Sequence, residues 1–322
     1  MYVPLHWHST FSFLEALGHP KDIIQRAKEL WYPSIAITDY NWMFWIPAFF
    51  QASQDSKNPD DEADQWVKSI FWAEIWFVMD INASLIWKNI WNLCLIAEND
   101  QWYHNMMELV AFANQQWYSN WIPKLDVNAL KEKSEWIIIF AWGEQSWMSK
   151  LVASGESEVR IREIYEMLQD IFGDRCYLEI TAQDEQVLSV TKKCNQFVYN
   201  LAKKTNTKLV VNNDFRYLRE WDKHTREIAL AIKDWAKMYD LNRRRPAGKY
   251  HIMDSEEIRN ICIKNWYDAS EVDEWMGNNW KIAEIANASM LLHQKLFPRY
   301  NIPDHVKALY EKYWADAIIE EE

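Results

Sequence analysis

The chain has 322 residues, of which 25% are charged and 49% hydrophobic, a composition typical of a globular protein with one or two domains. Its formal net charge of −12 argues against a protein that binds nucleic acid by itself through phosphate neutralisation. No apolar run approaches the roughly 18 residues of a membrane span, and the N-terminus lacks a signal-peptide pattern. Four cysteines without paired spacing favour the reducing cytoplasm over a disulfide framework or a zinc knuckle.

Short apolar runs alternate with amphipathic stretches along the first 235 residues. The runs that predict strands are residues 2–6, 34–38, 70–79, 90–97, 136–141, 175–181 and 208–212. The stretches that predict helices are residues 21–30, 46–54, 100–114, 158–171, 183–205 and 222–233. Because strands that alternate with helices usually pair in parallel, the pattern predicts an α/β fold with a mostly parallel sheet. Strands with few polar interruptions predict a barrel buried on both faces.

The pattern changes after about residue 236. The remaining chain is helical with polar joints, and its predicted helices are residues 255–263, 270–276, 281–292 and 305–319. We therefore expect a barrel over residues 1–235 and a C-terminal helical extension over residues 236–322.

Tryptophan and glycine have unusual totals, with 21 and 6 residues, whereas average usage would give about 7% glycine, roughly 22 residues. Trp31, Trp235 and Trp266 each follow a predicted helix, where left-handed glycine is favoured. Trp42 and Trp45 stand where a tight turn would favour glycine. We hypothesise that many tryptophans are glycines in the natural protein, because a UGA codon reassigned to glycine was translated as tryptophan. The alternative is a Trp-rich interaction module, whose aromatic platforms would cluster on one surface.

Candidate metal ligands lie on four predicted strands. His6 and His8 end the first strand, and alternation places both imidazoles on one side of an extended chain. Asp39 ends the second strand, Glu74 lies within the third and Asp214 follows the seventh. This mixed nitrogen and oxygen set suits zinc, manganese or iron, which commonly catalyse phosphoester hydrolysis.

Four segments resemble motifs of PHP (polymerase and histidinol phosphatase) domains. Residues 5–15 look like the opening motif, and residues 36–45 resemble the T-D-H-x-G-x-x-G segment with tryptophans at the two glycines. Residues 70–74 resemble the I-I-G-x-E strand, and residues 211–218 resemble the T-N-D-x-H-Y-L segment. The resemblance implies a distorted (β/α)7 barrel.

The chain is most similar to the N-terminal part of the bacterial replicative DNA polymerase III α subunits. Residues 97–103, 282–286 and 297–298 support this assignment over the stand-alone phosphatases. These subunits are DNA-directed DNA polymerases, cytoplasmic nucleotidyltransferases whose catalytic palm normally follows this region. We therefore expect no polymerisation and no catalytic residue in this chain. The resemblance implies a domain that stabilises the polymerase body and docks the proofreading exonuclease subunit, with only indirect contact to DNA and no membrane.

The family's metal cluster uses nine ligands, and this sequence keeps only some of them. The matching positions are His6, His8, Glu74 and Asp214, with Glu15 at a usual aspartate. Tyr40, Asn92 and Arg216 replace histidines, and residues 141–144 lack the family's cysteine. Because arginine stays protonated and cannot be a ligand, we expect Arg216 to pair with Asp214 or Glu74 and metal binding to be weak or absent.

The main alternative is a separate PHP-type phosphoesterase. It would use a divalent metal held by His6, His8, Glu15, Glu74 and Asp214 to hydrolyse a phosphate ester. That alternative predicts bound metal and turnover of a model ester, whereas the polymerase assignment predicts neither.

Overall fold

The computed structural model describes residues 2–57, 66–79, 91–115, 123–135, 137–140, 146–292, 303 and 305–308. Met1–Met290 form one compact unit and Leu291–Glu322 a second. None of the helices in the described part combines the length and the apolar character needed to cross a bilayer.

The compact unit is built on one sheet whose six described strands follow sequence order. They are β1 (Ser34–Ile37), β2 (Lys68–Phe77), β3 (Trp91–Ala97), β4 (Ile137–Phe140), β5 (Cys176–Thr181) and β6 (Leu209–Asn212). The β1–β2, β4–β5 and β5–β6 pairs are parallel, and β3 runs antiparallel to both β2 and β4. The predicted α/β fold is confirmed, and its six later strands lie where the apolar runs predicted them.

The first predicted strand takes a less regular form. Pro4 accepts a hydrogen bond from the amide of Ala36 in β1 (3.2 Å), and the His8 amide donates to the carbonyl of Phe215, just after β6 (3.0 Å). Trp7 and Phe215 form an isolated parallel bridge. The segment of residues 2–8 therefore lies between β1 and the chain that leaves β6, and the sheet curls toward closure. Because Pro4 has no amide hydrogen to donate, regular pairing is interrupted there.

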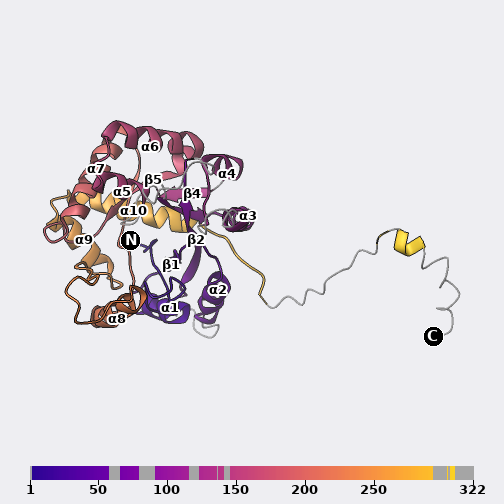
Figure 1. The fold of residues 1–322 in the computed structure, drawn as a ribbon, viewed down its shortest axis with the longest axis horizontal. Coiled ribbons are helices and arrows are strands. Elements are labelled where there is room, and N and C mark those ends of the chain that lie inside the picture. Colours follow the sequence, from indigo (N-terminus) through magenta and orange to yellow (C-terminus); the bar gives the residue numbers. More distant parts are fainter. Residues whose placement is uncertain are drawn as a thin grey trace. The chain divides into compact units, whose positions relative to one another are not determined.

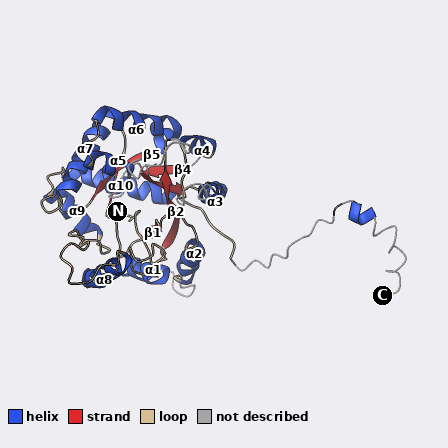
Figure 2. Ribbon diagram, in the orientation of Figure 1, coloured by secondary structure: helices blue, strands red, loops and turns tan. Residues whose placement is uncertain are grey.

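Helices pack around the strands of the compact unit, as Figure 1 and Figure 2 show. Their bounds are α1 (Pro20–Glu29), α2 (Ile46–Asp55), α3 (Asp100–Gln115), α4 (Val127–Glu132), α5 (Trp147–Ala153), α6 (Glu158–Phe172), α7 (Ser189–Thr205), α8 (Lys223–Lys233), α9 (Ser255–Lys264) and α10 (Ala269–Ile285). The sequence did not predict α4 and α5, because helices of six and seven residues are too short to show a helical period.

Helix α10 corrects the prediction of two separate helices over residues 270–276 and 281–292. It runs without a break through Gly277 and ends at Ile285. Its buried Asn279 side chain accepts from the Val211 amide (3.0 Å) and donates to the carbonyls of Val211 (2.8 Å) and Val3 (3.1 Å). Helix α10 is therefore bonded to β6 and to the N-terminal segment. Of the predicted helix over residues 305–319, residues 305–308 are helical and the rest lies outside the described residues.

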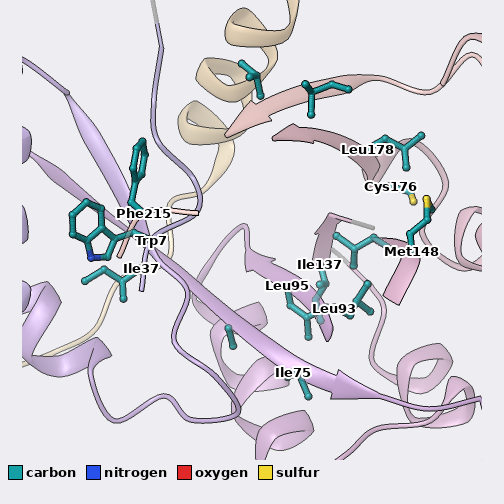
Figure 3. Packing of buried hydrophobic residues seen from close by; sticks show 14 of the residues in the cluster. Trp7, Ile37, Ile75, Leu93, Leu95, Ile137, Met148, Cys176, Leu178 and Phe215 are labelled. Carbon is teal, nitrogen blue, oxygen red and sulfur yellow. The ribbon is translucent and has the colours of Figure 1, made fainter. Parts of the chain in front are cut away.

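The sheet is buried on both faces, as the apolar strands predicted. In β1, Ile35 and Ile37 belong to the larger hydrophobic cluster, whereas Ala36 faces a smaller cluster that contains Ile282 of α10. Figure 3 shows part of the larger cluster, where Trp7, Ile37 and Phe215 lie together. The Trp7 and Phe215 ring centroids are 5.6 Å apart. This packing fixes the segment that carries His6 and His8.

Three tryptophans end helices in the left-handed region of the backbone map. The φ angles of Trp31, Trp235 and Trp266 are 60°, 54° and 69°, and their side chains are 77%, 97% and 90% exposed. These are the glycine-like positions that the sequence predicted. The prediction of a glycine-like turn at Trp42 or Trp45 is wrong. The residue with a positive φ is Asn41 (56°), and Trp45 has φ −77° at the start of α2.

Candidate metal centre

Three buried side chains meet inside the curled sheet. His6 and His8 come from the N-terminal segment and Glu74 from β2, and their potential ligand atoms lie within 4.8 Å of one another. Nε2 of His8 is 3.3 Å from Oε2 of Glu74, and Nε2 of His6 is 3.8 Å from the same oxygen. The prediction that both imidazoles lie on one side of the N-terminal segment is confirmed.

Asp214 is the fourth member of this group, with its Oδ1 atom 3.3 Å from Nε2 of His8. In the described structure, Nε2 of His8, Oε2 of Glu74 and Oδ1 of Asp214 are all buried and lack a hydrogen-bond partner. Buried polar atoms without partners are costly, so their convergence is a position where a ligand would be held. One nitrogen and two carboxylate oxygens match the donors that divalent transition metals accept. His6, His8 and Glu74 therefore fit one divalent ion, and Asp214 adds an oxygen next to His8.

His8 is oriented by a chain of side chains behind it. Its Nδ1 lies 3.1 Å from the Ser12 hydroxyl, which donates its proton to Oδ1 of Asp39 at 2.5 Å. The hydroxyl must then accept from Nδ1–H, which leaves the lone pair of Nε2 directed at the metal position. Asp39 was predicted among the ligands. In the structure, Ser12 lies between Asp39 and His8, so Asp39 orients His8 through Ser12 instead.

His6 is oriented in the same manner by Glu179 of β5. Nδ1 of His6 lies 3.3 Å from Oε1 of Glu179, whose Oε2 accepts from the Asn212 side chain at 2.9 Å. In the singly protonated form, a proton on Nδ1 leaves Nε2 as the ligand atom, so metal binding requires His6 to give up its Nε2 proton. Sequence analysis missed Glu179, although a carboxylate in the fully buried strand β5 was an available signal.

The residues that replace the family's histidines bond to the ligands that remain. Arg216 donates to Oδ2 of Asp214 at 2.5 Å and to the Tyr40 hydroxyl at 2.7 Å. Asn92 donates to Oε1 of Glu74 at 2.5 Å. The predicted pairing of Arg216 with Asp214 is therefore confirmed. These contacts occupy one oxygen of each carboxylate and leave the other oxygen for an ion.

The charges around the site shift its pKa values in different directions. Burial and then the Arg216 cation lower the pKa of His8, which favours the neutral form that binds metals. Burial acts to lower the pKa of His6 too, but Glu179 and Glu74 outweigh it and raise that pKa well above its usual value. Burial acts to raise the pKa of Asp214, but Arg216 and then the two histidines outweigh it and lower the pKa.

Glu15 is not brought into this group. Its carboxylate pairs with Lys233 Nζ at 2.8 Å and Arg244 Nη1 at 3.0 Å. The assignment of Glu15 as a ligand stays a prediction. Residues 141–144, where the family has a cysteine ligand, lie outside the described residues. Glu15 lines a cavity of about 770 Å³, and of the metal group only Asp214 also lines it, together with Tyr40 and Arg216.

Comparison with known proteins gives a consistent assignment. The PHP domain family matches residues 4–183. The DNA polymerase III subunit alpha of Deinococcus radiodurans is 26% identical over 319 residues, covering 94% of this chain and 22% of that protein. The Escherichia coli K12 subunit is 24% identical over 307 residues, covering 94% of this chain and 24% of that protein.

Among solved structures, a proposed metal-dependent phosphoesterase from Bifidobacterium adolescentis aligns with 81% of this chain and 96% of its own. That alignment has 10% sequence identity and a TM-score of 0.33. The chain spans about a quarter of the length of the curated polymerase relatives. The family match covers more than half of the chain, so this protein belongs to the PHP domain family and is a distant homologue of DNA polymerase III α subunits over most of its sequence.

Proposed function

We propose that this chain is the N-terminal PHP region of a replicative DNA polymerase III α subunit and acts as a structural and docking domain. The supporting observation is an alignment that covers 94% of this chain and 22% of the Deinococcus radiodurans subunit. In this proposal, residues 1–235 form the barrel and residues 236–322 lead toward the polymerase body. Its partners are the rest of the α subunit and the proofreading exonuclease subunit.

In this proposal the metal site holds fewer ions than the family's cluster. A single zinc, manganese or iron ion would be held by His6, His8, Glu74 and Asp214, and it would supply Lewis acidity and an acidified water. Arg216 fixes Asp214, and Asn92 fixes Glu74, by the hydrogen bonds described above. Arg216 brings a permanent cation to a position where the family has a ligand, so a multinuclear cluster does not fit.

Arg216 would help the domain to remain folded without metal. The Asp214 carboxylate would otherwise be an uncompensated buried charge, which typically costs about 3–5 kcal/mol. The guanidinium bonds to Asp214 and to Tyr40. Arg216 and Asp214 are buried, Tyr40 is partly buried, and all three side chains line the cavity. These contacts support a structural role.

The docking proposal is tested by co-expressing the chain with the proofreading exonuclease subunit from the same genome. We expect the two proteins to co-elute in size-exclusion chromatography, with His8→Ala having no effect on binding. Separate elution at micromolar concentrations would contradict the docking role. An unrelated exonuclease of similar size serves as the control.

The phosphoesterase alternative is favoured by one observation, the unpartnered atoms of His8, Glu74 and Asp214. It is tested by incubating the chain with manganese and para-nitrophenyl phosphate. Turnover that disappears in His8→Ala would support this alternative and remove the purely structural role. Turnover that survives in the variant would indicate a contaminating phosphatase.

A further inference from the structure

A groove of about 430 Å³ lies between helices α5, α6 and α7. It shares no lining residue with the cavity beside the metal group. Phe197 and Leu201 of α7 contribute apolar surface to the groove, and so does Val159 of α6, which is 57% exposed. Apolar side chains that stay accessible in a hollow commonly mark a surface that another molecule covers.

The groove follows one face of α7. Val190, Lys193, Phe197, Leu201 and Lys204 succeed one another at intervals of three or four residues, so they lie on the same face of the helix. Val190, at the beginning of this face, is 56% exposed. The two lysines flank the apolar pair in the middle. This arrangement is typical of a protein interface, which has an apolar centre and a charged rim.

Helix α7 is strongly basic in a protein whose net charge is −12. Residues 189–208 contain five lysines and neither aspartate nor glutamate. Lys203 pairs with Glu271 of α10, but no carboxylate of the described residues pairs with Lys193 or Lys204. The two lysines that line the groove therefore keep their charge available for carboxylates of another molecule.

The opposite charge lies on the α6 side of the groove. Glu156 and Glu158, at the beginning of α6, both line it. Glu156 pairs with Arg160 at 3.5 Å on the surface, a contact that contributes little, and no cation of the described residues pairs with Glu158. Arg162 also lines the groove, but Glu166 neutralises it at 3.4 Å. One wall is therefore acidic and the other basic, with apolar surface between them.

We propose that this groove is covered by the same groove of a second copy of the chain, so that the protein forms a two-fold dimer. In such an isologous contact, α6 of one copy lies opposite α7 of the other. Glu156 and Glu158 of each copy then face Lys193 and Lys204 of the other copy. Val159 of each copy packs on the apolar surface between the charged walls.

The distribution of charge favours a second copy as the occupant. A surface with separate acidic and basic walls is complementary to itself after a two-fold rotation, whereas a different protein would need both charges at the same spacing. Because each copy has a net charge of −12, association also requires local complementarity that overcomes the overall repulsion. The dimer uses no residue of the metal group, and it does not depend on the proposed docking role.

Charge-swapped variants of the 322-residue chain test the dimer by analytical ultracentrifugation. The wild-type chain should reach twice its mass of 38.7 kDa. Lys193→Glu/Lys204→Glu and Glu156→Lys/Glu158→Lys should each weaken the dimer at least about tenfold, because like charges then face each other. An equimolar mixture of the two double variants should restore association, since acidic and basic walls are again opposed. A general loss of stability would not produce this restoration.

The matched control is Lys21→Glu/Lys131→Glu, which changes the net charge equally on exposed positions of α1 and α4. It should leave the dimer Kd unchanged. Val159→Asp tests the apolar centre and should give a monomer. Its folding should be unaffected, because Val159 is exposed in the first turn of α6, where a carboxylate suits the helix dipole.

Three results would overturn the proposal. They are a wild-type chain that stays monomeric, double variants that dimerise as tightly as the wild type, and a mixture that associates no better than its components. Circular dichroism verifies the fold of each variant. If Glu156→Lys/Glu158→Lys does not fold, Val159→Asp takes its place, and a dimer of that variant as tight as the wild type would equally overturn the proposal.

Discussion

Trp31, Trp235 and Trp266 share one hydrogen-bond pattern. In each case the tryptophan amide bonds to the carbonyl three residues earlier, and the next amide bonds five residues back. This is the Schellman motif, whose left-handed position is usually glycine. A tryptophan there carries a Cβ in a strained region and exposes a large apolar ring, with no compensating contact required by the motif. The three sites therefore support the hypothesis that glycine occupies them in the natural protein.

Replacing Trp235 by glycine should stabilise the chain. Relief of the left-handed strain predicts a gain of about 1 kcal/mol in the free energy of unfolding, measured by urea denaturation. The control is Trp221→Gly, because Trp221 is similarly exposed (73%), has no positive φ, and has the Arg219 guanidinium 5.5 Å from its ring. Destabilisation by Trp235→Gly would argue that this tryptophan is native.

The natural protein gives a direct test of the same hypothesis. Mass spectrometry of peptides from the source organism should show glycine at positions 31, 235 and 266. The corresponding codons should be UGA in the gene. Tryptophan in those peptides, encoded by UGG, would remove the hypothesis and favour the Trp-rich interaction module.

Arg216→His should restore a ligand to the metal group. The substitution removes a fixed cation beside Asp214 and adds an imidazole nitrogen, so zinc or manganese affinity should increase at least about tenfold. Calorimetry with each metal measures the change. Arg216→Gln separates the two causes, since it removes the cation without adding a strong ligand. Equal affinity in the histidine and glutamine variants would show that charge removal alone is responsible.

The site was predictable from sequence only where a residue's role depends on local pattern. His6 and His8 alternate along one extended segment, and Glu74 interrupts an apolar strand, so all three could be identified. Glu179 orients His6, and Asp39 orients His8 through Ser12. Both carboxylates are far from their histidines in the sequence. Such positions depend on strand register, which no single segment encodes.

At the scale of elements, the side-chain amide of Asn279 bonds α10 to β6 and to the N-terminal segment, and Asn278 and Ala283 add bonds to Leu209 and Lys68. Asn279→Ala would leave the buried Val211 amide and the Val3 carbonyl without partners. We expect a loss of about 2–4 kcal/mol in the free energy of unfolding, from the broken bonds and the unsatisfied groups. Urea denaturation of Glu274→Ala, an exposed position on the same helix, provides the control. An equal, small effect of both variants would show that α10 contributes little to the barrel.

Most helices and strands follow from hydrophobic periodicity, because a barrel strand buried on both faces is an apolar run and an outer helix has one apolar face. The errors have local causes. Helices α4 and α5 begin at side-chain caps, Asp126 and Ser146, but are too short to show a period. Helix α10 was divided because Gly277 and its polar neighbours resemble a joint, whereas tertiary bonds keep them helical.

For the molecule as a whole, stability should decline in acid partly because of Asp214. Arg216 and the histidines outweigh burial and keep its folded-state pKa below the unfolded value of about 3.9. Its contribution is therefore present above that unfolded pKa and is lost as the pH falls through the folded pKa. In EDTA, Asp214→Asn should flatten the fall in unfolding free energy below about pH 4. An unchanged slope would contradict this, and the exposed Glu163→Gln is the control.

The position of residues 2–8 has a consequence for biosynthesis. These residues leave the ribosome before the residues that they bond to, which are Ala36, Phe215 and Asn279. More than 270 further residues must therefore be translated before all of these bonds can form. Until then the edges of β1 and β6 remain open to other chains, which is the period when unpaired edges promote aggregation. We expect this domain to depend on chaperones that bind nascent chains until about residue 279 has emerged.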